Sequence, residues 1–233
     1  MYTIVIAAAA LILFRVYRWN IVSDIARKFQ RTDIRKIPSN HNEALLAQVW
    51  KSEIGRCYIH SVECQLGVGY CSSATQRSIL KSITNFHQQD LPQPKFGPIT
   101  LDGHAAKLEK NSKGMLKCEV IYATEGYDAF YNALKKINNV RFRVSVNFLR
   151  SSLFGIPKPQ WNPMNILASF FGGHHSLLVG FFVEQNLVAV FDVNDTYGLF
   201  LVDARRLFDA CDTIPVEGIS GRSRGLVICE VLK

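Results

Sequence analysis

The chain lacks the cysteine spacing that structural metal sites use. Its 233 residues contain six cysteines, and none of them forms a C-x-x-C pair of the kind that binds zinc. We therefore expect no structural zinc site. We expect every cysteine except Cys71 to be a mostly buried free thiol in a protein of a reducing compartment. These are Cys57, Cys64, Cys118, Cys211 and Cys229.

An uninterrupted apolar segment of bilayer length is also missing. The segment TIVIAAAALILF near the N-terminus is uncharged, but it is too short to cross a bilayer comfortably unless it extends past Arg15. Neither the basic start nor the small-residue cleavage site of a secretory signal peptide is obvious. A mitochondrial presequence would be amphipathic, and a buried helix would need a surface to receive it.

Positive charge is concentrated directly after this apolar segment. The net charge is +8, and residues 15–36 hold seven basic residues against two acidic ones, which gives +5 of that total. We expect residues 1–22 to form a membrane anchor and residues 23–39 a basic juxtamembrane helix or linker, with the remaining chain facing the cytosol. Organellar targeting is the alternative. Outside this stretch no basic, aromatic-interleaved surface stands out, so no nucleic-acid partner is expected.

The rest of the chain, residues 40–233, has the size and composition of one compact domain, with 48% hydrophobic and 20% charged residues overall. Apolar spacing predicts helices early and strands late, with residues 57–70 extended or looped. The expected helices are 44–50, one led by Cys71, 100–108, one around 129–137 and a short one at 203–210; the expected strands are 116–123, a half-buried strand at 140–148, 175–183, 187–193 and 225–232. This order predicts an α+β domain with a helical half and an antiparallel sheet half.

A cysteine, a histidine and an aspartate occur in the order that papain-like cysteine enzymes use. Cys71 begins its expected helix, where free amide groups and the helix dipole stabilise a thiolate. His174 and Asp192 should begin and end neighbouring strands joined by a turn near residues 184–186, which would bring them together. Gln65 would donate to an oxyanion together with the Cys71 amide. The alternative is a packed cysteine and a satisfied core histidine.

At these residues the chain resembles the catalytic domain of the phytochelatin synthase family, papain-like transpeptidases that act on glutathione. The resemblance covers roughly residues 40–233 and has six polar positions in register, which makes it more specific than a bare Cys/His pair. The segments that carry it are Gln65 and Tyr70 before the nucleophile, ITLDGHAAKLEK, VNFLR ending in Arg150, GGHHS, VFDV and RSRGLVIC with Arg224.

The resemblance implies transfer of the γ-Glu-Cys unit of glutathione, through a Cys71 thioester, to another glutathione, with release of glycine. This is phytochelatin synthesis, a reaction of heavy-metal detoxification. It implies that Cys71 is the nucleophile, His174 the general base and acid, Asp192 its orienting group and Gln65 the oxyanion donor. Arg150 and Arg224 would bind substrate carboxylates.

The resemblance also bears on cofactors and partners. It implies no tightly bound cofactor and no protein metal site; a cadmium, zinc or copper ion would enter as a metal–glutathione thiolate substrate. Glutathione and a membrane are the expected partners. The oligomeric state stays open, with a homodimer as one alternative, and no cysteine-rich C-terminal domain is expected.

Three departures from the family pattern keep other functions open. Ser72 follows the nucleophile where the family has glycine, NDTYGLF follows Asp192, and the connection at residues 151–171 is longer than in the family. That connection is a lid, a second membrane contact or ordinary loop packing. The first alternative function is hydrolysis of glutathione, its conjugates or another peptide amide. The second is a non-catalytic, membrane-tethered binding protein.

Overall fold

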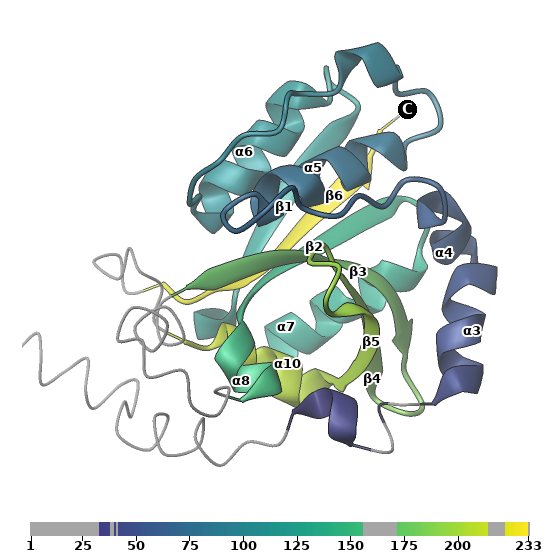
Figure 1. The fold of residues 1–233 in the computed structure, drawn as a ribbon, viewed down its shortest axis with the longest axis vertical. Coiled ribbons are helices and arrows are strands. Elements are labelled where there is room, and N and C mark those ends of the chain that lie inside the picture. The colour runs from purple at the N-terminus through teal and green to yellow at the C-terminus, as the bar shows by residue number, and fades with distance from the viewer. Residues whose placement is uncertain (1–32, 38–39, 41, 156–171, 214–221, 233) are drawn as a thin grey trace, which may run out of the picture.

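The computed structural model describes residues 33–37, 40, 42–155, 172–213 and 222–232 (Figure 1). The expected anchor at residues 1–22, most of the expected juxtamembrane segment and most of the 151–171 connection lie outside these residues. Across the described ranges, no helix combines the length and the apolar character that crossing a membrane requires.

The fold includes residues before the expected boundary at residue 40. The 3-10 helix η1 (Ile34–Lys36) precedes that boundary, and the Ile34 side chain is fully buried in a hydrophobic cluster with residues of the sheet and of helix α10. The helices that follow, in chain order, are α3 (Glu43–Lys51), α4 (Glu53–Tyr58), α5 (Cys71–Lys81), η3 (Gln88–Asp90), α6 (Leu101–Asn111), η4 (Ala123–Glu125), α7 (Tyr127–Leu134), η5 (Lys135–Asn138), α8 (Arg150–Phe154) and α10 (Ala204–Cys211).

Six strands form one antiparallel sheet in the order β1-β6-β2-β3-β4-β5. The last strand of the chain is therefore inserted between β1 and β2, whereas β2 to β5 form a meander. The strands are β1 (Leu116–Tyr122), β2 (Phe142–Leu149), β3 (Gly173–Phe182), β4 (Leu187–Asp192), β5 (Gly198–Asp203) and β6 (Gly225–Val231). N-terminal helices followed by an antiparallel sheet confirm the expected α+β class.

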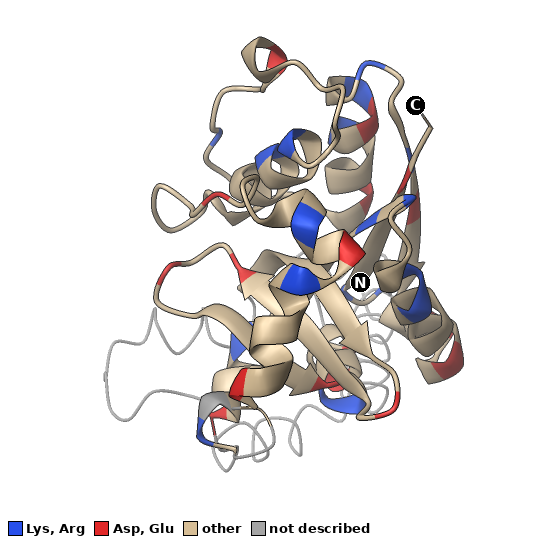
Figure 2. Cartoon of the chain, turned by 90° about the vertical axis from the view of Figure 1, so that its right-hand side faces the viewer, with Lys and Arg blue, Asp and Glu red and all other residues tan. Residues whose placement is uncertain are grey.

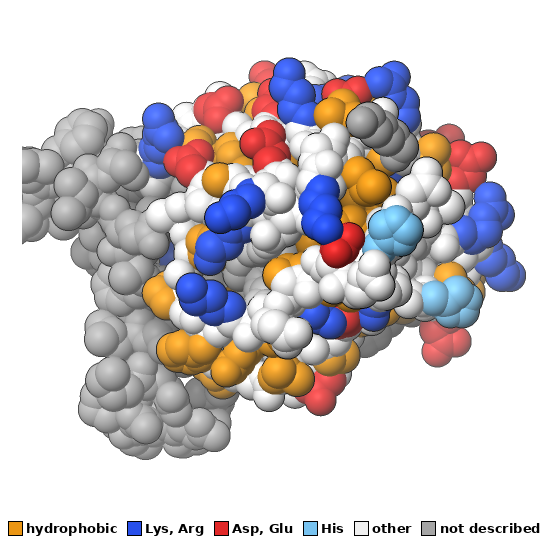
Figure 3. Space-filling view, turned by 90° about the horizontal axis from the view of Figure 1, so that it is seen from above, with side chains coloured by type: hydrophobic (Ala, Val, Ile, Leu, Met, Phe, Trp, Pro, Cys, Tyr) orange, Lys and Arg blue, Asp and Glu red, His pale blue; other side chains and the backbone are white. Residues whose placement is uncertain are grey.

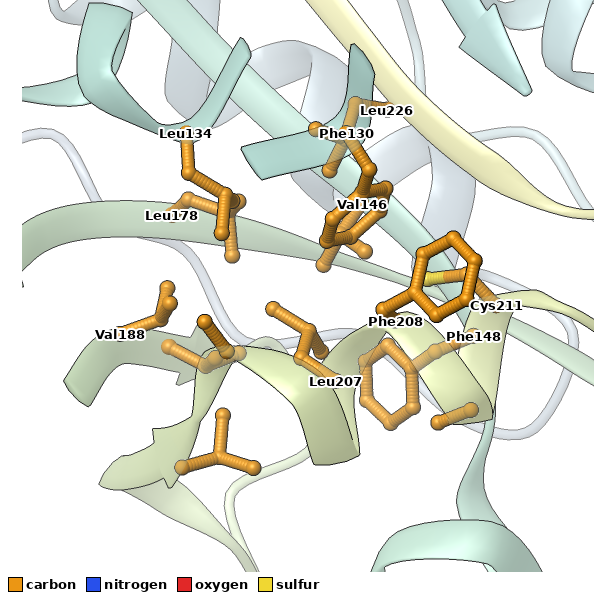
Figure 4. Close-up of a cluster of buried hydrophobic side chains, with 14 of the residues drawn as sticks. Phe130, Leu134, Val146, Phe148, Leu178, Val188, Leu207, Phe208, Cys211 and Leu226 are labelled. Carbon is orange, nitrogen blue, oxygen red and sulfur yellow. The ribbon is translucent and has the colours of Figure 1, made fainter. Parts of the chain in front are cut away.

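Helices cover both faces of the sheet. Helices α3 to α6 pack on one face, and α7, η5 and α10 pack on the other (Figure 1). Each face has its own hydrophobic cluster. Figure 4 shows the cluster between the sheet and α10, where Phe148 and Leu207 are fully buried. Fully burying side chains of this size contributes about 1.5–3 kcal/mol each, so these two layers fix the strand ends that carry the candidate site.

Strand β2 is buried on both faces, so the prediction of a half-buried strand is wrong. Arg143, Ser145 and Asn147 alternate with apolar residues as expected, but they lie under the α5 and α6 layer and not in solvent. Arg143 donates to the Ser82 side chain at 2.7 Å and to its carbonyl at 3.0 Å. Burial is tolerated because these polar groups find partners in the helix layer or, for Asn147, in the His175 ring on β3.

Three other expectations are corrected. Part of the region 57–70 is helical, since α4 runs to Tyr58 after a side-chain N-cap by Ser52. Strand β5 has no counterpart in the expectations, although 199–202 is apolar. Two cysteines expected as free thiols, Cys118 and Cys229, face each other on β1 and β6 and form a disulfide.

Charged residues lie mainly on the helices and loops around this core, with both signs interspersed (Figure 2). On the face seen in Figure 3, basic and acidic side chains also lie beside one another. One compact example is Glu63, which forms ion pairs with Arg77 at 2.6 Å and Lys81 at 3.0 Å and so ties the loop before Cys71 to α5.

Candidate active site

Cys71 is the first residue of helix α5, as the sequence predicts. No side chain caps this helix, because the N-cap residue Tyr70 makes no side-chain cap hydrogen bond. The approach to the helix is tight: Gly69 has a φ of 89°, and a side chain there would meet the Phe96 ring at 2.4 Å. The Gly97 amide also donates to the Gly69 carbonyl at 3.1 Å. A glycine at this position therefore lets the loop deliver Cys71 to the helix N-terminus.

The surroundings of the Cys71 sulfur favour the thiolate. Burial alone would raise the pKa of the thiol, but a hydrogen bond with the His174 side chain, the charge of that ring, and the backbone N–H groups of His175 and Ser72 lower it below its ordinary value. Each of these groups stabilises negative charge on sulfur more than it stabilises the neutral thiol. The Cys71 sulfur is thus activated by its contacts as well as by its place on the helix.

His174 and Asp192 meet across the β3–β4 hairpin. The His174 Nε2 atom lies 2.6 Å from the Asp192 Oδ1 atom, and the two residues are eighteen positions apart. Nε2 faces the aspartate, which leaves Nδ1 for the cysteine. Burial lowers the pKa of His174, but the Asp192 carboxylate and the contact with Cys71 outweigh burial and raise it above the ordinary value. The expected contact is therefore present.

Asp192 is ionised despite complete burial. Burial raises the pKa of this carboxyl, but His174, Arg150 and the backbone N–H of Asn194 together bring it below the ordinary value. The Asn194 amide donates to Oδ1 at 2.7 Å. A buried carboxylate with these donors holds the imidazole in one orientation and stabilises its protonated form.

Arg150 lies inside the site and contacts both members of this pair. Its Nη2 atom is 2.8 Å from His174 Nε2 and 3.1 Å from Asp192 Oδ1, and its guanidinium stacks over the Tyr197 ring at 4.8 Å. A guanidinium can only donate, so Arg150 requires Nε2 to be an unprotonated acceptor. The Asp192 carboxylate can only accept, so it requires Nε2 to carry a proton. When Nε2 carries the proton, Asp192 is its partner and Arg150 opposes the charge.

Gln65 is brought to the edge of the same site through its backbone. Its amide donates to the carbonyl of Val193, the residue after Asp192, at 2.7 Å. Its side chain is half-buried, and the amide group of that side chain has no hydrogen-bond partner among the described residues.

Arg224 is placed differently from the other predicted residues. Its side chain is only 3% exposed, and its Nη1 atom donates to the Thr213 hydroxyl. A side chain added at Gly173 would lie 3.1 Å from the Arg224 Nε atom, so this guanidinium sits beside the start of β3. The structure thus unites Cys71, His174, Asp192 and Arg150 and holds Arg224 in the interior.

Sequence reasoning missed a buried polar layer next to Cys71 and His174. It lies under helices α5 and α6 and consists of Ser72, Gln76, His104, Ser145, Asn147 and His175. The available signal was polar residues at core positions: His104 falls among the buried positions of α6, and the polar face of β2 was read as solvent-facing.

The described ranges contain no group of three or more His, Cys, Asp or Glu side chains arranged to hold a metal ion. No protein-family model matches the chain, and no curated protein matches its sequence. The chemistry of the site therefore has to be argued from its own atoms. A thiolate at a helix N-terminus, a buried imidazole in contact with it and a carboxylate behind that imidazole can attack a carbonyl carbon and protonate a leaving group.

Proposed function

We propose that the chain is a cysteine acyltransferase with a papain-like arrangement of its catalytic groups, and that it transfers the γ-Glu-Cys unit of glutathione in the manner of phytochelatin synthases. The observation that carries the proposal is the continuous contact from Cys71 through His174 to Asp192. Cys71 comes from a helix in one layer, and His174 and Asp192 come from a hairpin in the sheet. In papain-like enzymes too, a helix supplies the nucleophile and the sheet supplies the base.

The proposed reaction has two acyl-transfer steps. The Cys71 thiolate attacks the carbonyl carbon of the Cys-Gly amide of glutathione, and the tetrahedral oxyanion accepts hydrogen bonds from Gln65 and the helix N-terminus. His174 gives its proton to the leaving glycine nitrogen as the amide bond breaks, which leaves a γ-Glu-Cys thioester on Cys71. The amine of a second glutathione then attacks the thioester, His174 takes the proton, and Cys71 is released. A cadmium, zinc or copper ion takes part only as a thiolate complex of this second substrate.

Arg150 is the better of the two proposed carboxylate anchors. Glutathione is a small anion, and a guanidinium binds a carboxylate through a planar fork. The Arg150 side chain is 27% exposed, so it is accessible from solvent. Arg224 is buried and bonded to Thr213, and we propose that it supports the pocket from the interior beside Gly173.

The test is product analysis on purified full-length protein. Incubation with glutathione, with and without cadmium, should release glycine and give γ-Glu-Cys oligomers that mass spectrometry identifies by their added units. An acyl adduct on Cys71 with the mass of one γ-Glu-Cys unit should be trapped when acceptor is scarce. Cys71→Ser should lose both, and glycine release by this variant would show that Cys71 is not the nucleophile.

Hydrolysis is the second candidate, because the residue next to the nucleophile differs from the family pattern. Ser72 contributes a hydroxyl beside Cys71, and this hydroxyl is bonded to His104 at 2.9 Å. If water and not glutathione accepts the acyl group, the same experiment yields the γ-Glu-Cys dipeptide and glycine without oligomers. A Cys71 that no thiol probe labels at neutral pH would favour the non-catalytic binding protein.

Attachment to a membrane completes the proposal. The apolar segment TIVIAAAALILF and the basic residues after it are its basis, with the acyltransferase domain on the cytosolic side. Deleting residues 1–22 should move the protein from the membrane to the soluble fraction, and a full-length protein that is already soluble would overturn the anchor.

A further inference from the structure

Two histidines outside the proposed catalytic set are stacked in the interior behind Cys71. The His104 and His175 rings are 4.3 Å apart and nearly parallel, with an interplanar angle of 12°. His104 comes from α6 and His175 from β3, and the two side chains are 0% and 3% exposed. The mechanism proposed above assigns neither ring a role.

This pair is bonded to the neighbour of the nucleophile. The Ser72 hydroxyl lies 2.9 Å from His104 Nδ1, and the Gln76 amide donates to the same hydroxyl at 3.0 Å. Ser72 directly follows Cys71, so the first turn of α5 is tied to His104 on α6. On the other side of the ring, the Ser145 hydroxyl lies 3.4 Å from His104 Nε2.

The pair is also connected to His174, the proposed base. His175 directly follows His174, and its backbone N–H donates to the Cys71 sulfur. Its ring is held by the Asn147 side chain, whose Nδ2 atom lies 2.7 Å from His175 Nε2. A continuous path therefore runs from Ser72, which follows Cys71, through the His104 ring to the stacked ring of His175, which follows His174.

Neither ring is a candidate proton carrier. The charged and titratable groups that face His104 are His175 and Lys107, and His174 and Arg224 face His175. Burial and these cationic neighbours lower the pKa of His175 to about 3 and place that of His104 well below its ordinary value. The two rings are thus neutral and held by hydrogen bonds.

We propose that His104 is a positioning residue which, through Ser72 on one side and the stacked His175 ring on the other, sets the distance between the Cys71 sulfur and the His174 imidazole. The inference rests on the proposed role of Cys71 as nucleophile and adds a residue that touches neither substrate nor sulfur. Its physical basis is that errors of about 1 Å in such geometry cost roughly 10²-fold in rate.

The test measures the reactivity of Cys71 without any substrate. Iodoacetamide alkylation of the full-length protein is followed between pH 5 and 9, and the Cys71 peptide is quantified by mass spectrometry because other free thiols are present. His104→Leu keeps the volume and removes both hydrogen bonds, so we expect alkylation at neutral pH to fall about tenfold or more and its pH midpoint to rise. His104→Gln retains an acceptor for Ser72 and should recover part of the rate.

Thr75→Val is the matched control. Thr75 lies on helix α5 with Cys71, is fully buried, and its hydroxyl has no partner among the described residues, so its loss should leave the profile unchanged. If His104→Leu does not fold, Ser72→Ala cuts the link on the α5 side and should shift the midpoint in the same direction.

The outcomes separate the two proposals. A wild-type Cys71 that is unreactive at neutral pH overturns the proposed nucleophile and the positioning role with it. A reactive wild type, together with a folded His104→Leu variant of unchanged rate and midpoint, overturns the positioning role alone.

Discussion

His174 and His175 are consecutive residues of one strand, and the pKa values of their imidazoles are shifted in opposite directions. Both side chains are buried, at 5% and 3% exposure, and burial by itself lowers the pKa of either ring. The pKa of His174 is nevertheless raised, whereas that of His175 falls to about 3. Because burial is the same for both, the difference comes from their partners.

The partners differ because successive residues of a strand point to opposite faces of the sheet. His174 meets the Asp192 carboxylate, whereas His175 meets the neutral amide of Asn147 and the ring of His104. One ring is poised to gain and lose a proton, and the other stays neutral and supports the site. The Asp192 carboxylate is therefore what distinguishes the proposed chemical role of His174 from the structural role of His175.

The largest expected effect follows from removing that carboxylate. Asp192→Asn keeps the shape and the contact with the Asn194 amide, but it removes the charge that holds His174 protonated. We expect glycine release at neutral pH to fall on the order of 10⁴-fold, as when a triad aspartate is made neutral, and Cys71 alkylation to fall with it. Asp195→Asn, an exposed change three residues away, should have no effect. A mild loss in Asp192→Asn would mean that the two histidines are not distinguished by this charge.

The next effect concerns stability in acid. His175 and His104 have a lower pKa in the folded chain than in the unfolded chain, so below pH 6.5 the unfolded state binds more protons and stability falls with falling pH. Denaturant titrations between pH 6.5 and 5.5, above the pH at which most carboxyl groups titrate, should show a loss of about 1–2 kcal/mol.

His174 should contribute with the opposite sign in the same window. Its folded-state pKa is raised, so its contribution is fully present below the unfolded pKa and is lost as the pH rises through the folded value. His175→Phe should flatten the acid slope, whereas His87→Gln, at an exposed position, should leave it unchanged. An unchanged slope in His175→Phe would show that this ring does become protonated in the folded state.

A smaller effect is expected at Gln65, the proposed oxyanion donor, which has no contact with the two histidines in the proposed mechanism. Gln65→Ala removes one oxyanion donor and should lower turnover by ~10². The alkylation profile of Cys71 should stay as in the wild type, because no transition-state oxyanion forms in that reaction. Gln88→Ala, at an exposed position, is the control. A Gln65→Ala variant with an altered alkylation profile would place Gln65 in the activation of the thiol.

The strong local signals in the sequence were sufficient for much of the fold. The helices expected at 100–108 and 203–210 are present as α6 and α10, and the side chains of Thr100 and Asp203 cap them. The meeting of His174 and Asp192 also followed from hairpin geometry, since it depends only on two strands and the turn between them.

What the sequence could not supply is the second layer over β2. A strand that alternates polar and apolar residues normally faces water on one side. Here Arg143 and Ser145 bond to distant residues of the helix layer, and Asn147 bonds to the ring of His175 on the neighbouring strand. His175 was missed, and the contact of Arg150 with His174 and Asp192 was not predicted, for the same reason: these partners are set by packing between layers and not by spacing along one element.

The smallest effect tests the charge that opposes His174. After burial, the Arg150 guanidinium is the other influence that lowers the pKa of this ring. Arg150→Gln should therefore raise that pKa and let the thiolate–imidazolium pair persist to higher pH. Because the Arg150–Asp192 contact is partly exposed, we expect no more than about a fivefold change in alkylation at neutral pH, from an interaction of roughly 0.2–1 kcal/mol.

Arg150→Lys separates the charge of this residue from its shape. The lysine keeps the positive charge but has no planar fork, so the alkylation profile should remain close to wild type while the KM for glutathione rises. If Arg150→Gln instead abolishes alkylation, Arg150 is needed to hold His174 and Asp192 together, and the contrast with His175 then depends on two partners of His174 rather than on Asp192 alone.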